Sequence, residues 1–159
     1  NCPATVNFNT NGQNAVSRGL ELTTAWRVAP RISIDGGYTY TDSHYSSATT
    51  GDPINTQLGA VPKHLENLGT TWRLTSKWNA YVGARHNDAM FLDVNHTIYQ
   101  PAFTLVNAST SYRATERVEV YGSVNNATDV RYADNATTSA AGEILGLHRS
   151  FTSGLRLKF

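Results

Sequence analysis

The side chains in this chain that could do chemistry are its five histidines and the carboxylates near them. His86, Asp88, Asp93 and His96 lie close together in the sequence, and imidazole and carboxylate groups are common metal ligands. Nothing in their spacing fixes the four side chains on one face, and histidine is also an ordinary polar residue at a protein rim. We therefore predict neither a metal site nor a cofactor.

Motifs of catalysis are missing from the sequence. It contains no nucleophile–base pair, no glycine-rich phosphate loop and no paired-carboxylate motif. We predict that the chain is not an enzyme.

Composition narrows the function classes further. The 159 residues carry a formal net charge of +1 and only 16% of them are charged, with no basic run, so we predict no nucleic-acid partner. The chain lacks the apolar run of about 18 residues that a transmembrane helix needs. The single cysteine, Cys2, cannot form a disulfide within the chain. The abundant Thr, Tyr, Gly and Asn suit strands and turns.

Period-two alternation of apolar and polar residues predicts about seven antiparallel strands. They are expected at about 17–27, 32–41, 67–74, 78–85, 105–113, 118–125 and 153–159, with 5–8 as a candidate eighth. Short turns are expected at 28–31, 74–77 and 114–117. Long loops are expected at about 46–60, 91–101 and 133–146. This alternation of short and long connections is typical of transmembrane β-barrels.

The two faces of the predicted strands differ in the same sense throughout. One face is apolar, and its aromatic residues lie near the short turns or the C-terminus, as in a membrane-interface girdle: Trp26, Trp72, Trp78, Tyr112 and Phe159. The other face carries isolated charges among small polar residues: Glu21, Arg27, Asp35, Arg73, Arg85, Glu119 and Arg156. We therefore predict an all-β fold of antiparallel transmembrane β-barrel strands. A soluble β-sandwich binding module remains an alternative, because a solvated sheet face would show the same alternation.

The strand count leaves two arrangements open within the membrane. Bacterial single-chain barrels have even strand numbers, and an open edge cannot face lipid. Either segment 5–8 closes a self-contained small barrel with a structural or adhesive role, or the chain is a fragment of a larger barrel.

The last seven residues form an amphipathic strand with an aromatic end. Leu155, Leu157 and Phe159 share one face, while Gly154 and Arg156 point the other way. With Ser153, this pattern resembles the C-terminal signal that the bacterial barrel-assembly machinery recognises. The resemblance implies an assembly role for Ser153, Gly154, Leu157 and Phe159.

Five motifs in order resemble the last third of a TonB-dependent outer-membrane receptor. They are Ser17-Arg18-Gly19-Leu20-Glu21-Leu22, Val61-Pro62-Lys63-His64, Phe103-Thr104-Leu105-Val106-Asn107-Ala108-Ser109, Asn125-Asn126-Ala127-Thr128-Asp129-Val130-Arg131-Tyr132 and the terminal Gly154-Leu155-Arg156-Leu157-Lys158-Phe159. One departure is clear: Ala127-Thr128 stands where the family usually has Leu-Phe. Two large apolar side chains near the outer rim are therefore replaced by smaller ones.

The resemblance implies a roughly 22-stranded barrel in the bacterial outer membrane, in contact with its lipid and importing a ferric siderophore. Residues 1–159 would be its C-terminal part, without the N-terminal plug and the TonB-contacting segment, which lie upstream with the remaining strands in that family. Loop aromatics grip the ligand in siderophore receptors, which makes candidates of Tyr45, Phe91, His96, Tyr99 and Tyr132. For any single one of them, packing at the interface is the alternative that we favour.

Overall fold

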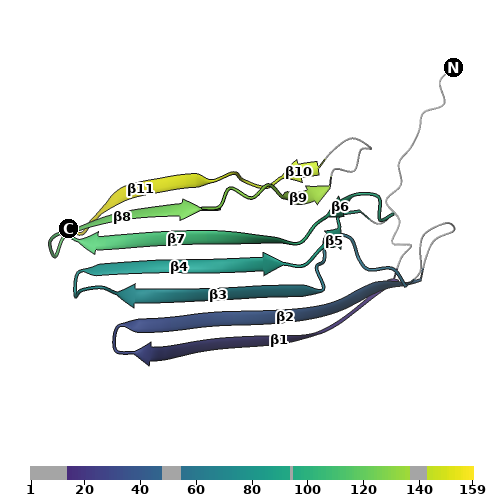
Figure 1. Cartoon of the computed structure of the whole chain (residues 1–159), viewed down its shortest axis with the longest axis horizontal. Coiled ribbons are helices and arrows are strands. Elements are labelled where there is room, and N and C mark those ends of the chain that lie inside the picture. The colour runs from purple at the N-terminus through teal and green to yellow at the C-terminus, as the bar shows by residue number, and fades with distance from the viewer. Residues whose placement is uncertain (1–13, 48–54, 94, 137–142) are drawn as a thin grey trace, which may run out of the picture.

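The fold is a single curved antiparallel sheet of seven long strands that follow one another in chain order (Figure 1). The computed structural model describes residues 14–47, 55–93, 95–136 and 143–159. The sheet strands are β1 (Asn14–Ala29), β2 (Ile32–Ser47), β3 (His64–Arg73), β4 (Trp78–Asn87), β7 (Phe103–Arg113), β8 (Val118–Asn125) and β11 (Ser150–Leu157). The prediction of all-β antiparallel strands is confirmed.

The strands differ from the predicted ones mainly at their outer ends. β1 and β2 are 16 residues long, and β1 begins at Asn14 rather than near Ser17. Polar residues such as Ser43 and His44 continue the ladder there, because backbone hydrogen bonding to a neighbouring strand does not require an apolar side chain. The candidate strand at 5–8 lies outside the described residues.

The pairing register aligns the apolar faces across the whole sheet. Trp72 pairs with Ala80, Val82 with Ala108, and Leu155 with Val120. Large apolar side chains of this outward face are solvent-exposed, with Leu22 at 55% and Leu155 at 66%. Strand residues that are buried, such as Gly83 and Asn87, belong to the opposite, inward face. The prediction of which residues share a face is confirmed.

All the short turns lie at the same end of the sheet as the C-terminus (Figure 1). The β3–β4 and β7–β8 turns have the same construction. Thr75 Oγ1 accepts the backbone N–H of Trp78 at 3.0 Å, and Thr115 Oγ1 accepts that of Val118 at 3.1 Å. Such side-chain-to-backbone bonds satisfy turn donors without a glycine, so the four-residue turns predicted at 74–77 and 114–117 are confirmed.

The opposite end of the sheet holds all the long connections, and two of them contain structure that the sequence analysis missed. The segment predicted as a loop at 91–101 contains a hairpin of β5 (Met90–Phe91) and β6 (Tyr99–Gln100). The segment predicted as a loop at 133–146 contains a hairpin of β9 (Ala133–Ala136) and β10 (Glu143–Leu145). These strands are too short for a visible period-two pattern, which is why the long connections were predicted but the hairpins within them were not.

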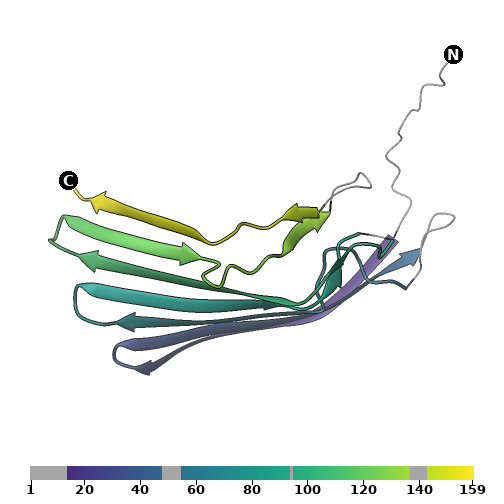
Figure 2. The same ribbon diagram turned by 45° about the horizontal axis from the view of Figure 1, so that its top comes forward.

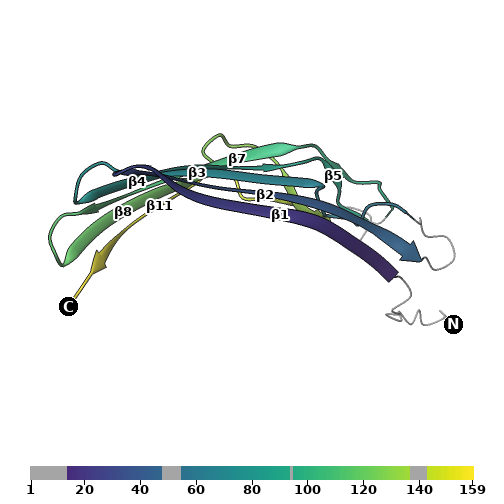
Figure 3. The same ribbon diagram turned by 90° about the horizontal axis from the view of Figure 1, so that it is seen from below.

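The large sheet is curved and, in the part of the chain that the structure describes, has two open edges. Figures 2 and 3 show it as an arched wall, with β1 at one edge and β11 at the other. Over the described part of the chain, no second large sheet packs against it, so the β-sandwich alternative is wrong. No helix among the described residues is long and apolar enough to span a membrane.

Tyrosine rings cover glycines on the inward face of the sheet. A Cβ on Gly83 would lie 2.4 Å from the Tyr81 hydroxyl, and a Cβ on Gly154 would lie 2.5 Å from that of Tyr121. The guanidinium of Arg156 lies 5.7 Å from the centroid of the same Tyr121 ring and pairs with Glu119 at 2.5 Å. Gly154 is therefore required where the last strand meets its neighbour.

We predict that Gly154→Ala destabilises the intact protein by about 1–3 kcal/mol, because the added methyl group displaces the Tyr121 ring. The midpoint of urea unfolding measures the change. Gly122→Ala is the matched control, since the nearest atom to its added Cβ is the Thr152 carbonyl oxygen at 3.8 Å. Equal midpoints for the two variants would contradict the close packing of Tyr121 on Gly154.

Candidate functional site

The long connections form one continuous layer at their end of the sheet. The Leu58 amide donates to the Ser43 carbonyl at 3.2 Å, and the Ala60 amide donates to the Phe91 carbonyl at 2.7 Å. The Ala133 amide donates to the Gln100 side chain at 2.7 Å, linking two connections distant in sequence. These hydrogen bonds run from β2 across to β9. They therefore connect the described residues of the three long connections to one another.

The β5–β6 hairpin presents an aromatic cluster. Phe91 and His96 stack with ring centroids 4.5 Å apart and planes within 4° of parallel. Tyr99 meets the Phe91 ring edge-on at 5.4 Å, and its side chain is 55% exposed. His96 Nε2 also donates to the Gln57 carbonyl at 2.9 Å, which ties the cluster to the neighbouring connection. Three of the five predicted ligand-binding residues therefore lie together.

Asp93 organises the tip of this hairpin. Its carboxylate accepts hydrogen bonds from the Thr97 amide at 2.8 Å, the Thr97 hydroxyl at 2.8 Å and the Ile98 amide at 2.7 Å. The Ile98 hydrogen bond is the main cause that lowers the pKa of Asp93 below its usual value, and the Thr97 bonds act in the same direction against partial desolvation. The charged carboxylate thus holds the turn that carries His96.

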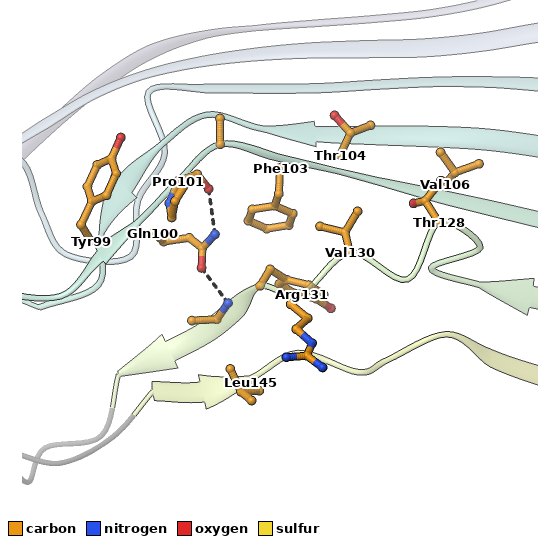
Figure 4. A pocket seen from close by; sticks show the side chains of 13 residues that line it. Tyr99, Gln100, Pro101, Phe103, Thr104, Val106, Thr128, Val130, Arg131 and Leu145 are labelled. Atoms are coloured by element: carbon orange, nitrogen blue, oxygen red, sulfur yellow. Dashed lines mark hydrogen bonds between the residues drawn. The ribbon is translucent and has the colours of Figure 1, made fainter.

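A cavity of about 710 Å³ opens between β6, the start of β7 and the segment before β9 (Figure 4). Tyr99, Phe103, Arg131 and Tyr132 line it. Tyr132 stacks on Phe103 at 4.7 Å, and its ring also covers Gly146, where a Cβ would lie 2.0 Å from it. Two predicted residues, Tyr99 and Tyr132, therefore border the same space.

Small side chains help to leave this cavity open. Thr128 lines it together with Val106 and Val130. Thr128 is also one of the two positions at which the sequence motif has lost a large apolar residue. The departure noted in the sequence therefore coincides with open space.

Asn126 anchors the connection that follows β8. Its buried side chain accepts the Val130 amide at 2.9 Å and donates to the carbonyls of Val130 at 2.9 Å and Leu147 at 3.1 Å. Its own amide donates to Asn107 Oδ1 at 2.9 Å. The Asn126 side chain thus joins both ends of the connection, and its backbone amide ties them to β7.

Asp129 completes this anchor. It accepts the Arg149 amide at 2.9 Å and lies 3.4 Å from His148 Nδ1. The Arg149 hydrogen bond is the main cause that lowers the pKa of Asp129, with His148 acting in the same direction. Asn126 and Asp129 both adopt positive φ, at 49° and 54°, which asparagine and aspartate tolerate better than most residues. The Asn126-x-x-Asp129 part of the motif is therefore explained by this turn.

The remaining sequence candidates are placed as follows. Tyr45 lies on β2, where its amide donates to the Thr56 carbonyl at 3.2 Å, and no ring contact joins it to the aromatic cluster in the described residues. His86 is hydrogen-bonded to Thr104 at 2.8 Å, while His96 is used in the hairpin. No group of three or more His, Cys, Asp or Glu in the described ranges could hold a metal ion.

Sequence reasoning missed Gln100 and Arg131. Gln100 is buried, donates to the Pro101 carbonyl at 2.7 Å and receives the Ala133 amide (Figure 4). Arg131 is an exposed cation beside Tyr132 on the cavity wall. Arg131 could have been noticed, because it belongs to the same motif as Tyr132. No local signal marks Gln100, whose partner is remote in sequence.

We predict that Asn126→Ala lowers the free energy of local opening of the connection after β8 by about 2–3 kcal/mol, because buried backbone groups lose their hydrogen-bond partners. The rate of hydrogen exchange at the Val130 amide of the intact protein measures this free energy. Asn125→Ala is the control, since Asn125 is exposed and its side chain makes no hydrogen bond with the described residues. Unchanged exchange at Val130 would contradict the anchoring role.

We also predict that the β5–β6 turn depends on the charge of Asp93. A carboxylate with a lowered pKa contributes stability that is complete above its unfolded-state pKa of about 3.9 and is lost as pH falls through the folded-state value. Amide exchange at Thr97 and Ile98, corrected for intrinsic pH effects, should stay slow at pH 5 and rise only below about pH 4. Asp93→Ala should remove the protection at neutral pH. Asp134→Ala, at an exposed carboxylate, serves as control; protection that survives in Asp93→Ala would refute the assignment.

Comparison with known protein families gives a match over most of the chain. A family described as TonB dependent receptor-like, beta-barrel matches residues 1–127. A probable TonB-dependent siderophore receptor of Acinetobacter baumannii is 28% identical over 131 residues, which are 76% of this chain and 18% of that protein. The ferrioxamine receptor of Yersinia enterocolitica is 29% identical over 122 residues, which are 73% of this chain and 17% of that receptor.

Solved structures share the fold. The ferric yersiniabactin uptake receptor of Yersinia pestis superposes with a TM-score of 0.83 at 19% identity, over 94% of this chain and 24% of that receptor. The siderophore receptor of Acinetobacter baumannii superposes with a TM-score of 0.79 at 24% identity, over 92% of this chain and 22% of that receptor. The chain therefore spans less than a quarter of the proteins that it resembles.

Proposed function

Because the chain belongs to the TonB-dependent receptor β-barrel family, we propose that it supplies consecutive strands of a large outer-membrane barrel that imports a ferric siderophore. The observation that supports this proposal most directly is the seven-stranded sheet. Its outward face is apolar, its strands alternate short and long connections, and β1 and β11 leave open edges among the described residues. Open edges cannot face lipid, so further strands are needed to close the barrel.

The inward face suits a wide, polar lumen. It carries isolated charges such as Asp35 and Arg85, and small residues such as Gly69 and Gly83. A narrow barrel would fill its interior with large side chains. In the proposed receptor this lumen holds the N-terminal plug, which contacts TonB, as the resemblance of the sequence to TonB-dependent receptors implies.

The loop layer supplies the ligand-binding groups in this proposal. Phe91, His96 and Tyr99 form one aromatic cluster, and Tyr132 with Arg131 borders the adjoining cavity. Ferric siderophores are bulky and commonly anionic, so aromatic faces and a guanidinium are suitable partners. Tyr45 would act from the outer end of β2, at the edge of the same layer.

The barrel-assembly machinery is the proposed partner of the last strand. Ser153, Leu157 and the residues paired with them lie on the outward face, while Gly154 is covered by Tyr121 on the inward face. Phe159 follows the strand and is fully exposed. Ser153, Leu157 and Phe159 therefore remain available along one edge strand, because among the described residues β11 has only β8 as a neighbour.

We predict that Phe91→Ala and Tyr99→Ala each lower siderophore uptake by the full-length receptor about tenfold, through loss of aromatic contact with the ligand. Uptake of radioactive iron as ferrioxamine or ferric yersiniabactin, the ligands named for the similar receptors, is the measurement. Tyr112→Ala is the control, because Tyr112 is an exposed aromatic at the short-turn end. Failure of the unaltered receptor to take up any of these or other ferric siderophores would refute the proposed function.

A further inference from the structure

The outward face of the sheet carries one row of polar side chains across four neighbouring strands. Glu66 on β3 pairs in register with His86 on β4. Tyr38 on β2 flanks Glu66, and Thr104 on β7 flanks His86. On β1 the row continues with Leu22, which is apolar and 55% exposed. The two ionisable side chains, Glu66 and His86, are therefore neighbours at the centre of a polar strip.

This strip lies inside the part of the barrel that faces acyl chains. A rise of about 3.3 Å per residue places Glu66 about 20 Å along β3 from Trp72, which lies at the short-turn end. A strand tilt of about 40° reduces this distance to a height of about 15 Å. The apolar band of an outer-membrane barrel is about 25 Å tall, so Glu66 lies about 10 Å below its outer boundary. Acyl chains offer no hydrogen-bond donor or acceptor, so a carboxylate at this depth needs a polar partner.

The described part of the chain does not supply that partner. Glu66 is exposed, and its carboxylate has no hydrogen bond or ion pair with the described residues. His86 is hydrogen-bonded through Nδ1 to the Thr104 hydroxyl at 2.8 Å. When this hydroxyl donates, the neutral imidazole carries its proton on Nε2, which has no partner in the same ranges. An acceptor on β3 and a donor on β4 are thus left open side by side.

We propose that a second copy of the receptor covers this strip, with Glu66 of each copy hydrogen-bonded to His86 of the other. Two copies in one membrane have the same orientation, so a two-fold axis that relates them runs along the membrane normal. An axis between Glu66 and His86 places the acceptor of one copy opposite the donor of the other, twice. In a ladder tilted by about 40°, the two residues differ in height by about 3 Å, which their side chains can span.

The second copy is favoured as the occupant because the strip is complementary to itself. A partner that offered only donors or only acceptors would leave either His86 or Glu66 open. A groove of about 430 Å³, which Leu68 and Ala84 line together with this pair, leaves room for side chains of the other copy. Because the wall is arched (Figure 3), two barrels meet along a narrow contact, and the two polar pairs supply a large part of its energy. This inference rests on the proposed closed barrel and not on its ligand.

The test uses the full-length receptor in vesicles of phosphatidylethanolamine and phosphatidylglycerol. Energy transfer between donor-labelled and acceptor-labelled copies, followed as the protein is diluted with lipid, gives the dissociation constant of the dimer. Glu66→His and His86→Glu should each raise this constant about tenfold, because two like groups then face each other at each contact. An unaltered receptor that stays monomeric at every dilution would overturn the proposal.

Mixing the two single variants makes the test specific for the reciprocal pairing. A copy with Glu66→His has imidazoles at both positions, and a copy with His86→Glu has carboxylates at both. A mixed pair restores both contacts, so donor-labelled Glu66→His should associate with acceptor-labelled His86→Glu as tightly as unaltered copies do. Mixed dimers would also show that both variants fold. If the two folded variants fail to associate, the pairing is refuted.

Leu22→His is the matched control, since it adds an imidazole to the same row on β1, outside the strip. It should leave the dissociation constant unchanged. Should either single variant fail to fold, Glu66→Gln takes its place, because it keeps the shape and an acceptor but lacks the charge. Glu66→Gln should raise the dissociation constant about threefold, whereas an unchanged constant would count against the pairing.

Dimerisation and import have separate readouts. Uptake of ferric siderophore should be the same for all these variants, since none of them alters the loop layer. Uptake by a receptor that never dimerises would refute this inference alone. Dimers of a receptor that takes up no ferric siderophore would refute the import proposal alone.

Discussion

A wall that separates lipid from a polar lumen must satisfy every backbone N–H and C=O within its own hydrogen-bond ladder, because the lipid offers no partner. This constraint explains the main features of the structure. It selects extended strands, it aligns them in one continuous antiparallel order, and it forces their side chains to alternate between lipid and lumen. The same constraint makes the open edges that β1 and β11 have among the described residues incompatible with lipid, which is why we propose that the sheet is part of a closed barrel.

The inward face of the sheet does not meet lipid, and its side chains pack through specific contacts. Tyr81 and Tyr121 cover glycines, and Arg156 contacts both Glu119 and a tyrosine ring. These contacts fill the space close to the backbone that a glycine leaves empty. The lipid side needs no comparable precision, because acyl chains adapt to its surface, and its exposed Leu and Val side chains need only remain apolar.

The two ends of the wall follow different rules. At the short-turn end, local bonds from Thr75 and Thr115 reverse the chain within four residues. At the loop end, order depends on bonds between segments distant in sequence, such as Ala133 to Gln100 and His96 to Gln57. Charged carboxylates at Asp93 and Asp129 stabilise single turns in this layer. Ligand recognition is proposed here because such a layer can vary without disturbing the ladder below it.

The sequence by itself determined the strands, their two faces and the short turns. Alternation with a period of two and tight turns are local properties, so residues such as Trp26, Trp72 and Tyr112 could be assigned to the lipid face without any pairing partner. The ordered motifs also identified the receptor family, since each motif marks a strand or its end.

Only the tertiary structure decided which loop residues meet and which outward side chains of neighbouring strands lie side by side. Phe91, His96 and Tyr99 are brought together by a hairpin too short to leave a periodic signal, and Tyr45 is left outside their cluster. Glu66 and His86 become neighbours through strand register, as do Tyr38 and Glu66. These relations are set by hydrogen-bonded pairing between distant segments, and no local pattern in a single strand contains that information.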